Sequence, residues 1–474
     1  MKILFIKVKI ETNMMGRGIE LDIIEPLDFE YIAAGVPDHD IEFFDLRIEK
    51  ESALPGVISR FQPDVVGFSA FTAEVYAAKK IMKKVKDIKE NIKIVVGGFH
   101  ATFAPQDFNV PYIDAIVIGP GVESFREIIR SFEKGLSLHP IAGLALPGPG
   151  GLHLTPQRPL PTSLDDYPRP DRRICTHYQK NYFADLWRPV GTIRTSAGCH
   201  FRCNFCAVWR LTGGHYLAHS AERTAEEMLH MKQNYLFFTD DNCFFPLPQE
   251  IERMDRVYRI LKDAQFKKKL YMCSRSDCIV NYPRIFEKWA SIGLTRLFVG
   301  LEAGTNRELA GWNKNNQVTV NEKAIAILHE LGIEVWGQFI IKPDYTRDDF
   351  KRLADYILHH NITYPAFSIL TPHPGLDPND YRQYGEFNKN FEFFDHMHTV
   401  FNPTLPLKEF YYEFANLWRV CYSPMCRTGF NRYAKSIYKI FFSSPPHLLR
   451  LLRASKLFFQ RCQNVWQEHE PFTS

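Results

Sequence analysis

Three of the ten cysteines lie in one short stretch, "RTSAGCHFRCNFCAVW", where Cys199, Cys203 and Cys206 follow the spacing C-x3-C-x2-C. Thiolates this close can hold a structural zinc ion or an iron–sulfur cluster, or they can be small buried residues. Structural zinc takes four ligands, and Cys273 and Cys278, which straddle a predicted strand, would be poor partners. Three thiolates instead leave one iron of a 4Fe–4S cluster open to another molecule.

The composition predicts a soluble protein with more than one domain. The chain has 474 residues, 45% of them hydrophobic and 24% charged, and its formal net charge of +4 gives no sign of nucleic-acid binding. The start, "MKILFIKVKI", lacks the features of a signal peptide, and no apolar run is long enough for a membrane-spanning helix. We therefore expect a cytoplasmic protein, in which clustered cysteines bind a metal more often than they form disulfides.

Residues 1–137 alternate short apolar runs with amphipathic segments, which predicts a doubly wound, Rossmann-like α/β domain with a parallel sheet. Strands are expected in the first ten residues and over 41–46, 64–71, 92–98 and 114–121, and helices over 73–89 and 121–135. Such sheets bind ligands at the carboxyl ends of their strands. Small residues gather there, either to admit a ligand or simply to make tight turns: Ser69, Thr72, Gly97, Gly98, Gly119 and Gly121.

Residues 138–190 are rich in proline and glycine and are expected to form a linker. Over 191–380 a second alternation predicts a (βα)6-type partial TIM barrel. After the strand that leads into the cysteines, strands are expected over 234–242, 268–277, 294–304, 334–343 and 365–375. Chemistry in such barrels sits at the carboxyl ends of the strands, where this chain has the polar residues Asp240, Asp241, Arg275 and Glu302.

The last part of the chain, 381–474, is predicted to be helical with a basic tail. From Arg427 to Arg461 it has eight Lys or Arg residues and no Asp or Glu, interleaved with Phe, Leu and Tyr. This pattern is typical of an amphipathic helix on an anionic membrane, which predicts peripheral contact with the inner membrane through 427–461. The alternative is a helix that packs on the barrel with its basic face in water.

The cysteine loop, with Phe205 just before the last cysteine and a barrel strand before it, resembles the radical S-adenosylmethionine (SAM) superfamily. The resemblance implies that the three cysteines hold a 4Fe–4S cluster, whose open iron binds SAM so that a 5′-deoxyadenosyl radical can form. It also implies SAM contacts at the strand ends, by Phe205 in the loop and by Asp240, Asp241, Arg275 and Glu302. For each strand-end residue, a salt bridge at the barrel mouth is the alternative.

The stretches "VVGFSAFT", "IVVGGFHATFAPQDF" and "DAIVIGPGVESFREI" resemble the cobalamin-binding domain that precedes the barrel in many radical SAM proteins. The resemblance implies that the small residues above, with His100 and Glu123, surround a cobalamin. The D-x-H-x-x-G motif that supplies an axial histidine elsewhere is absent, and Pro120 stands where a Glu is common. We expect His100 to be a turn or cofactor-rim residue rather than a cobalt ligand.

Together the two domains resemble cobalamin-dependent methyltransferases, and "FFTDDN", "FVGLEAG" and "HTVFNPTLPLKEFYYEF" resemble the hopanoid C-3 methylases. This implies methylation of an unactivated carbon in a polycyclic lipid, with electrons from a flavodoxin or ferredoxin. The stretch "ILTPHPGLDPNDY" departs from the family pattern, so another apolar substrate, or cyclisation or rearrangement, stays open. Thiomethylation would need a second cysteine cluster, and no cysteine precedes Cys175. An electron carrier or a zinc-stabilised binding module is the alternative from another class.

Overall fold

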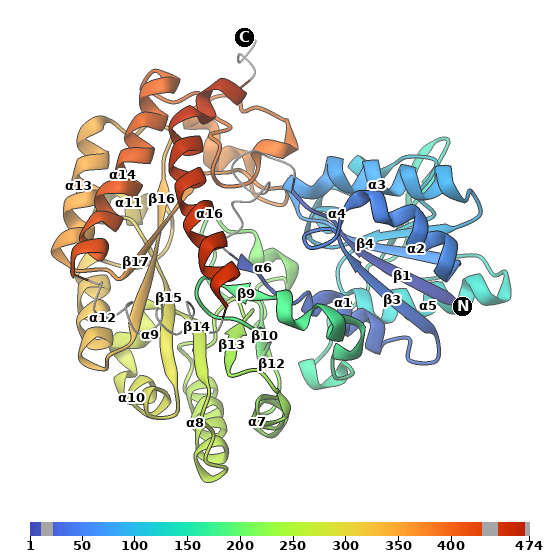
Figure 1. Ribbon diagram of the computed structural model, residues 1–474, viewed down its shortest axis with the longest axis horizontal. Helices are drawn as coiled ribbons and strands as arrows, with labels where there is room; N and C mark the ends of the chain where they lie inside the picture. Colours follow the sequence, from blue (N-terminus) through green and yellow to red (C-terminus); the bar gives the residue numbers. More distant parts are fainter. Residues whose placement is uncertain (11–21, 429–443, 470–474) are drawn as a thin grey trace.

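The computed structural model describes residues 1–10, 22–428 and 444–469, and it shows two α/β domains side by side (Figure 1). The N-terminal domain contains a seven-stranded sheet in the order β3-β1-β4-β5-β6-β7-β8. The first five strands in this order are parallel: β3 (Asp40–Asp45), β1 (Lys2–Lys7), β4 (Val65–Ser69), β5 (Lys93–Gly97) and β6 (Ala115–Val117). This is the doubly wound domain that the sequence predicts.

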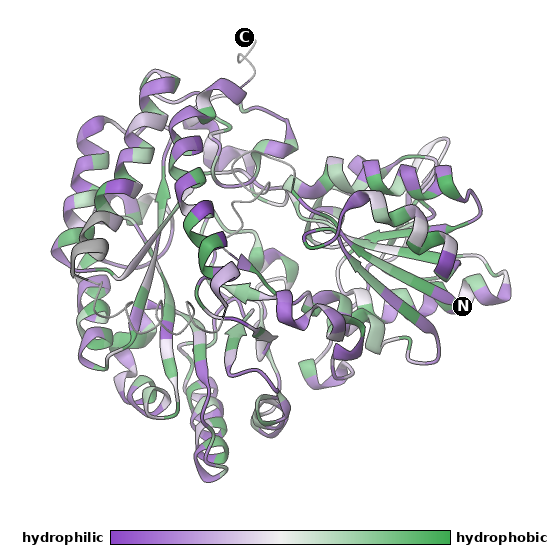
Figure 2. Cartoon of the chain, viewed as in Figure 1, coloured by the Kyte–Doolittle hydropathy of each residue, from purple (hydrophilic) through white to green (hydrophobic). Residues whose placement is uncertain are grey.

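Alternate residues of β1 pack against helices on opposite faces of the sheet. Ile3 and Phe5 share a core with α1 (Leu27–Ala34) and α5 (Gly121–Lys134). Leu4 and Ile6 share another with α2 (Leu54–Phe61) and α3 (Val75–Ile88). Because both faces are covered, the central strands are mainly apolar between their ends, as the hydropathy colouring shows (Figure 2). The carboxyl ends of the strands are therefore the part of the sheet left for a ligand.

The first sheet extends further along the chain than the sequence predicts. Part of the expected linker, 138–190, folds as β7 (Leu144–Gly148) and β8 (Gly151–Leu154), which pair antiparallel and extend the sheet past β6. Proline and glycine hide these strands in the sequence, because Pro147 interrupts the run and Gly151 turns the chain with a φ of 110°. The linker prediction is corrected to this extent.

The second domain is a partial barrel of six parallel strands in the order β10-β13-β14-β15-β16-β17. Its strands are β10 (Val190–Ile193), β13 (Tyr235–Phe238), β14 (Lys269–Arg275), β15 (Leu294–Glu302), β16 (Glu334–Ile341) and β17 (Tyr364–Ile369). The helices between them include α7 (Ala221–His230), α8 (Pro248–Asp263), α10 (Pro283–Ser291), α12 (Val318–Glu330) and α13 (Arg347–His359). Within the described residues β10 and β17 stand at the two ends of this sheet, so the barrel is partial.

The two faces of the barrel strands differ in burial. Residues that face the helices are almost completely buried, among them Leu236, Met272, Leu297, Val335 and Phe367. Their neighbours on the inner face are only half-buried, among them Phe237, Cys273, Phe298, Trp336 and Ser368. Since a filled interior would bury both sets equally, the inside of the barrel is partly open.

Arg296 closes the amino end of the barrel. Its guanidinium donates to the Tyr364 hydroxyl at 2.8 Å and to Glu334 at 3.1 Å, and it lies 4.1 Å from the centre of the Tyr364 ring. Tyr271 and Trp336 also stand against this cation. Arg296 and these rings therefore close the inner face of the sheet at the amino ends of its strands.

Two C-terminal helices pack on the barrel, α14 (Leu407–Thr428) and α16 (Pro445–Asn464). Trp418 contacts Phe367 of β17 at 4.8 Å and Phe458 of α16 at 5.0 Å. Of the predicted basic tail, residues 429–443 lie outside the described residues. In α16, Leu451 and Phe458 are buried against the rest of the protein, and contact of the tail with a membrane stays a prediction. In the described part of the chain, no helix is long and apolar enough to cross a membrane.

Candidate active site

The cysteine loop leaves the barrel after β10 and a two-residue strand, β11 (Ser196–Ala197), and runs into α6 (Val208–Leu211). Cys203 is buried, and Cys199 and Cys206 are half-buried. Gly198 has a φ of 85°, and a Cβ at this position would collide with the His215 carbonyl and the Thr212 side chain. The sharp turn ahead of Cys199 therefore requires glycine.

Asp240 and Asp241, at the end of β13, hold the start of this loop. The Asp240 carboxylate accepts hydrogen bonds from Thr195 Oγ1 at 2.6 Å, from Ser196 Oγ at 2.5 Å and from the Thr195 amide. Asp241 accepts one from the Gly198 amide at 2.7 Å. Burial raises the pKa of Asp240, and these donors oppose the shift. The contacts of Asp240 thus run to the loop and position the cysteines, and a SAM contact by Asp241 stays a prediction.

Two buried cations stand beside the loop. The Arg275 guanidinium lies 3.5 Å from the centre of the Phe201 ring and pairs with Asp277 at 2.8 Å. Lys314 donates to Glu302 at 2.6 Å and to the Gly300 carbonyl at 2.6 Å. Arg275 and Glu302 therefore each form a salt bridge at the barrel mouth, while their contacts with SAM stay predictions. Lys314 is a residue that sequence reasoning missed.

The thiols lie in desolvated surroundings, with the cation of Arg275 near Cys199. Burial raises the pKa of Cys199 to about 11 and that of Cys206 to about 12, while the charge of Arg275 opposes the shift at Cys199. The thiols therefore stay protonated until a metal displaces their protons. Among the described residues, no three His, Cys, Asp or Glu side chains gather as ligands of a single metal ion.

Polar atoms without partners lie next to the loop, which fits a polar ligand there. Asn242 follows Asp241 and is 2% exposed, yet neither its amide nitrogen nor its amide oxygen has a hydrogen-bond partner in the described structure. The indole nitrogens of Trp209 and Trp312 are in the same situation. Because a buried polar group without a partner is costly, a bound molecule with donors and acceptors would satisfy these atoms. Phe205 packs edge-to-face on Trp312, with ring centres 5.7 Å apart, and so lies beside these polar atoms.

The small residues predicted in the N-terminal domain do meet at one edge of its sheet. Ser69 ends β4, Gly97 ends β5, and Gly119 follows β6. A Cβ at Gly98, which has a φ of 98°, would lie 2.8 Å from the Ala70 amide nitrogen, so only glycine fits there. At Gly119 a Cβ would meet open space, which leaves this edge accessible.

His100 and Thr72 lie below that edge rather than on it. His100 is completely buried, with Nε2 at 3.0 Å from the Asp107 carboxylate and Nδ1 at 3.3 Å from the Thr72 hydroxyl. Thr72 is 1% exposed. Both ring nitrogens of His100 are therefore occupied by protein groups, as a turn residue would have them, and cofactor contact by His100 or Thr72 stays a prediction.

Gly121 and Glu123 lie at the start of α5. A Cβ at Gly121 would lie 3.0 Å from the Ile32 side chain, so this glycine serves helix packing. The Glu123 carboxylate pairs with Arg126 at 2.7 Å on the same helix. Neither residue points clearly to a ligand, and their cofactor contacts stay predictions.

An aromatic surface at the same edge was missed by sequence reasoning. Phe71 is 59% exposed and stacks on Phe99 at 6.3 Å, and Phe99 also contacts Phe103 at 5.1 Å. Beneath it, Lys7 lies 5.4 Å from the centre of the Phe71 ring and forms a buried ion pair with Glu74 at 2.7 Å. A flat, largely apolar ligand such as a corrin ring fits this surface.

A segment that follows β17 joins this edge to the barrel. The rings of His373 and Phe99 have their centres 6.0 Å apart. The centre of the Phe391 ring lies 4.8 Å from that of His100 and 5.6 Å from that of Tyr76. Phe391 and Phe205 of the cysteine loop pack on the same aromatic cluster. The aromatic edge of the first domain and the cysteine loop of the second are thus bridged by one continuous set of contacts.

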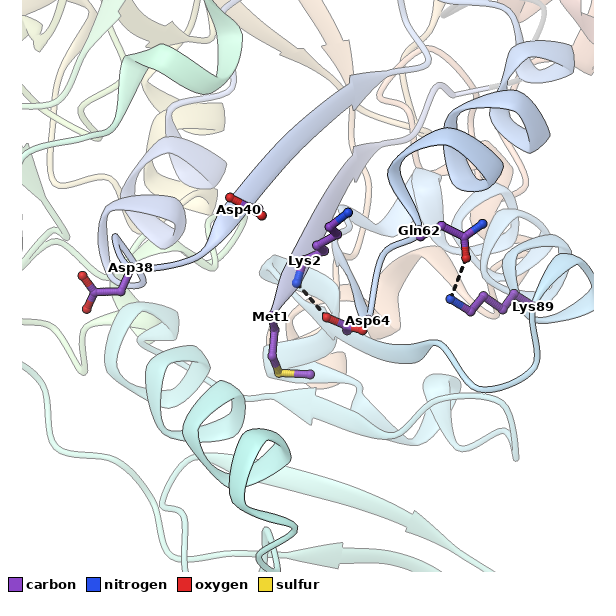
Figure 3. Close-up of a pocket in the computed structure, with 7 residues that line it drawn as sticks. All are labelled: Met1, Lys2, Asp38, Asp40, Gln62, Asp64 and Lys89. Carbon is purple, nitrogen blue, oxygen red and sulfur yellow. Dashed lines mark hydrogen bonds between the residues drawn. The ribbon is translucent and has the colours of Figure 1, made fainter.

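A hollow of about 470 Å³ lies at the opposite, amino edge of the first sheet (Figure 3). It is open and mostly polar, and in it the backbone amide of Lys2 donates to the Asp64 carboxylate and the Lys89 ammonium donates to the Gln62 side-chain oxygen. None of the predicted site residues lines it.

Comparison with known proteins matches residues 21–129 to the B12 binding domain family and residues 193–357 to the Radical SAM superfamily. An uncharacterised methyltransferase of Pyrococcus horikoshii is 28% identical over 395 residues, 81% of this chain and 84% of that protein. The hopanoid C-3 methylase of Methylococcus capsulatus is 26% identical over 411 residues, 84% of this chain and 76% of the methylase. Among solved structures, the cobalamin-dependent SAM radical enzyme OxsB with aqua-cobalamin bound has a TM-score of 0.68 at 17% identity, covering 98% of this chain and 72% of OxsB.

Proposed function

We propose that this chain, which matches the B12 binding domain family over residues 21–129 and the Radical SAM superfamily over residues 193–357, is a cobalamin-dependent methyltransferase that methylates an unactivated carbon of a polycyclic, hopanoid-like lipid. Its cofactors are a 4Fe–4S cluster, SAM and cobalamin. When bound, they supply hydrogen-atom abstraction and a transferable methyl group. The reaction class rests on the two domain families, and the lipid substrate is the finer part of the proposal.

The apolar, half-open interior of the barrel is the observation that supports a lipid. Phe237, Phe298 and Trp336 present half-buried rings to this space, and Arg296 closes its amino end. Burial of an apolar molecule against these rings would stabilise the complex and exclude water from the reacting carbon. One polar pair lies inside, Gln338 Nε2 donating to Ser368 Oγ at 2.7 Å, and it would bind a polar group of the substrate.

The chain's own residues prepare the site in three ways. Cys199, Cys203 and Cys206 would hold the cluster, with Asp240 fixing the start of their loop through Thr195 and Ser196. Asn242 would donate to and accept from the bound SAM with its two unpartnered amide atoms. The Phe71 and Phe99 rings would support the corrin.

A lipid substrate must come from a membrane, and α16 offers a surface for contact with one. Leu449 and Leu452 are 54% and 60% exposed, and Arg453 and Lys456 on the same helix are exposed as well. Exposed leucines beside basic residues favour an anionic bilayer surface. We therefore propose peripheral contact with the inner membrane here, with electrons supplied by a flavodoxin or ferredoxin.

The test is a methylation assay on the anaerobically reconstituted enzyme with hydroxocobalamin, a chemical reductant, a hopanoid in anionic vesicles, and SAM that carries a deuterated methyl group. The proposal predicts a hopanoid with one deuterated methyl group, formed together with 5′-deoxyadenosine. Cys203→Ala should form neither product. If 5′-deoxyadenosine forms but the lipid stays unlabelled across several polycyclic lipids, the substrate proposal is wrong, while SAM cleavage itself remains supported.

A further inference from the structure

Two cysteines outside the cluster loop lie side by side in the barrel. Cys243, five residues after β13, has its sulfur 3.5 Å from that of Cys273 in β14. The backbones are also joined, since the Cys243 amide donates to the Cys273 carbonyl at 3.1 Å. We propose that Cys243 and Cys273 are a site of reversible oxidation, where exchange with a small disulfide converts the two thiols into one disulfide bond.

The two thiols differ in access, which sets the order of events. Cys243 is completely buried, whereas Cys273 is half-buried on the strand face that turns to the open interior. Burial raises the pKa of Cys243 well above its usual value, so this thiol is a poor first nucleophile. The oxidant therefore meets Cys273 first, from the half-buried inner face of the sheet, and Cys243 completes the bond.

A small disulfide such as oxidised glutathione can accept the two electrons and the two protons that the thiols release. The Cys273 thiolate attacks one glutathione sulfur and releases the other as a thiolate, which takes a proton. The Cys243 sulfur then attacks the Cys273 sulfur and releases the second glutathione, so both cysteine protons and two electrons end on two glutathione thiols. To form the bond, the sulfurs must approach from 3.5 Å to about 2.0 Å.

Oxidation at this pair would reach the cysteine loop. The Cys273 thiol donates to the Asp240 carbonyl at 3.1 Å, and the Asp240 carboxylate holds Thr195 and Ser196 just ahead of Cys199. A disulfide removes the thiol hydrogen and therefore this hydrogen bond. The oxidation state of the pair is thus linked to the position of the cluster ligands.

The direct test is a peptide map of the full-length reconstituted enzyme after anaerobic treatment with oxidised glutathione. Free thiols are blocked and the protein is digested with trypsin without reduction. The proposal predicts a disulfide between the peptides 233–253 and 270–275, which contain Cys243 and Cys273. The link should vanish in Cys273→Ser and in Cys243→Ala, and it should persist in Cys278→Ser, the matched buried cysteine on α9 (Ser276–Asn281).

A second measurement tests the link to the cluster loop. Oxidised enzyme should form 5′-deoxyadenosine from SAM about three- to tenfold more slowly, the expected effect of one lost hydrogen bond, and dithiothreitol should restore the rate. Cys273→Ser should show no such loss relative to its own untreated rate. Glutathione that stays attached to Cys273, or no reaction at either cysteine, would overturn the proposal. An equal rate loss in Cys273→Ser would overturn the link to the loop.

Discussion

The two sheet edges that meet in this molecule are built from opposite kinds of residue. At the barrel edge the charged groups are buried and paired, with Arg275 on Asp277 and Lys314 on Glu302 around the cysteine loop. At the edge of the N-terminal domain the polar groups lie below the surface, and the aromatic ring of Phe71 is exposed. The first edge suits a charged cluster through electrostatics, and the second suits a flat cofactor through shape.

Removal of a cluster ligand should have the largest effect, and this effect should be limited to the barrel edge. Cys203→Ala leaves two thiolates, so we expect iron content to fall from about four per chain to near zero and SAM cleavage to stop. Hydroxocobalamin binding should persist, because the other edge is untouched. Iron analysis and a cobalamin titration of the same sample measure both.

Cys278→Ala is the control for that variant. Cys278 is completely buried and lies outside the cysteine loop, so the variant should keep its iron. If Cys203→Ala keeps its full iron content, or if Cys278→Ala loses it, the assignment of the cluster ligands is wrong.

Breaking the buried ion pair at the barrel edge should have the next largest effect. Lys314 is 3% exposed and Glu302 is 6% exposed. Lys314→Met leaves the Glu302 charge buried without its partner, which should lower the free energy of unfolding by about 3 kcal/mol. The double variant Lys314→Met/Glu302→Gln should recover most of this loss, as measured by anaerobic chemical denaturation.

Lys342→Met is the matched control on the barrel surface, since Lys342 pairs with Asp344 at 3.1 Å where the Asp344 side chain is 49% exposed. Lys342→Met should lower the free energy of unfolding by less than about 1 kcal/mol. Equal losses in Lys314→Met and Lys342→Met would remove the argument that the barrel edge depends on buried charge.

The same contrast explains what the sequence could predict. The three cysteines are neighbours in the chain, so their spacing alone identified the loop, and the apolar runs identified the parallel strands of both sheets but not β7 and β8. Lys314 could not be found in this way. It lies in a loop twelve residues beyond Glu302, and only the folded chain brings its ammonium to that carboxylate.

At the N-terminal edge, sequence reasoning predicted which residues end the strands but not which side chains are exposed there. Ser69 and Gly97 end their strands as predicted. His100 was expected to be a turn or cofactor-rim residue by resemblance to cobalamin-binding domains, and in the fold Thr72 and Asp107, from two other segments, hold both of its ring nitrogens in the interior. Phe71 was passed over because nothing local separates an exposed aromatic residue from a core one.

The segment that bridges the two edges should respond to pH. Within it, His398 is completely buried, with Nδ1 at 3.0 Å from Asp395 and Nε2 at 3.7 Å from Glu468. Burial alone would lower the pKa of His398, but the two carboxylates raise it to about 9. The folded protein therefore keeps a proton that the unfolded chain loses near pH 6.5, so stability should fall as pH rises from about 6.5 to about 9.

The raised pKa of His398 corresponds to a loss of at most about 3 kcal/mol in the free energy of unfolding over this pH range. Unfolding midpoints at pH 6 and pH 9 should differ less in His398→Gln than in the parent chain. If the two proteins show the same pH dependence, His398 is not protonated in the bridge.

The exposed aromatic surface should give the smallest effect and the cleanest one. Phe71→Ala removes a ring that is 59% exposed, so stability should barely change. Loss of one stacking contact should weaken hydroxocobalamin binding by about three- to tenfold, read from the visible spectrum of a titration. Leu136→Ala is the matched control, because Leu136 is also 59% exposed but follows the far end of α5. Equal affinities for the two variants would mean that the N-terminal edge holds its cofactor by its loops alone, and the contrast between the two edges would then rest on charge rather than on aromatic shape.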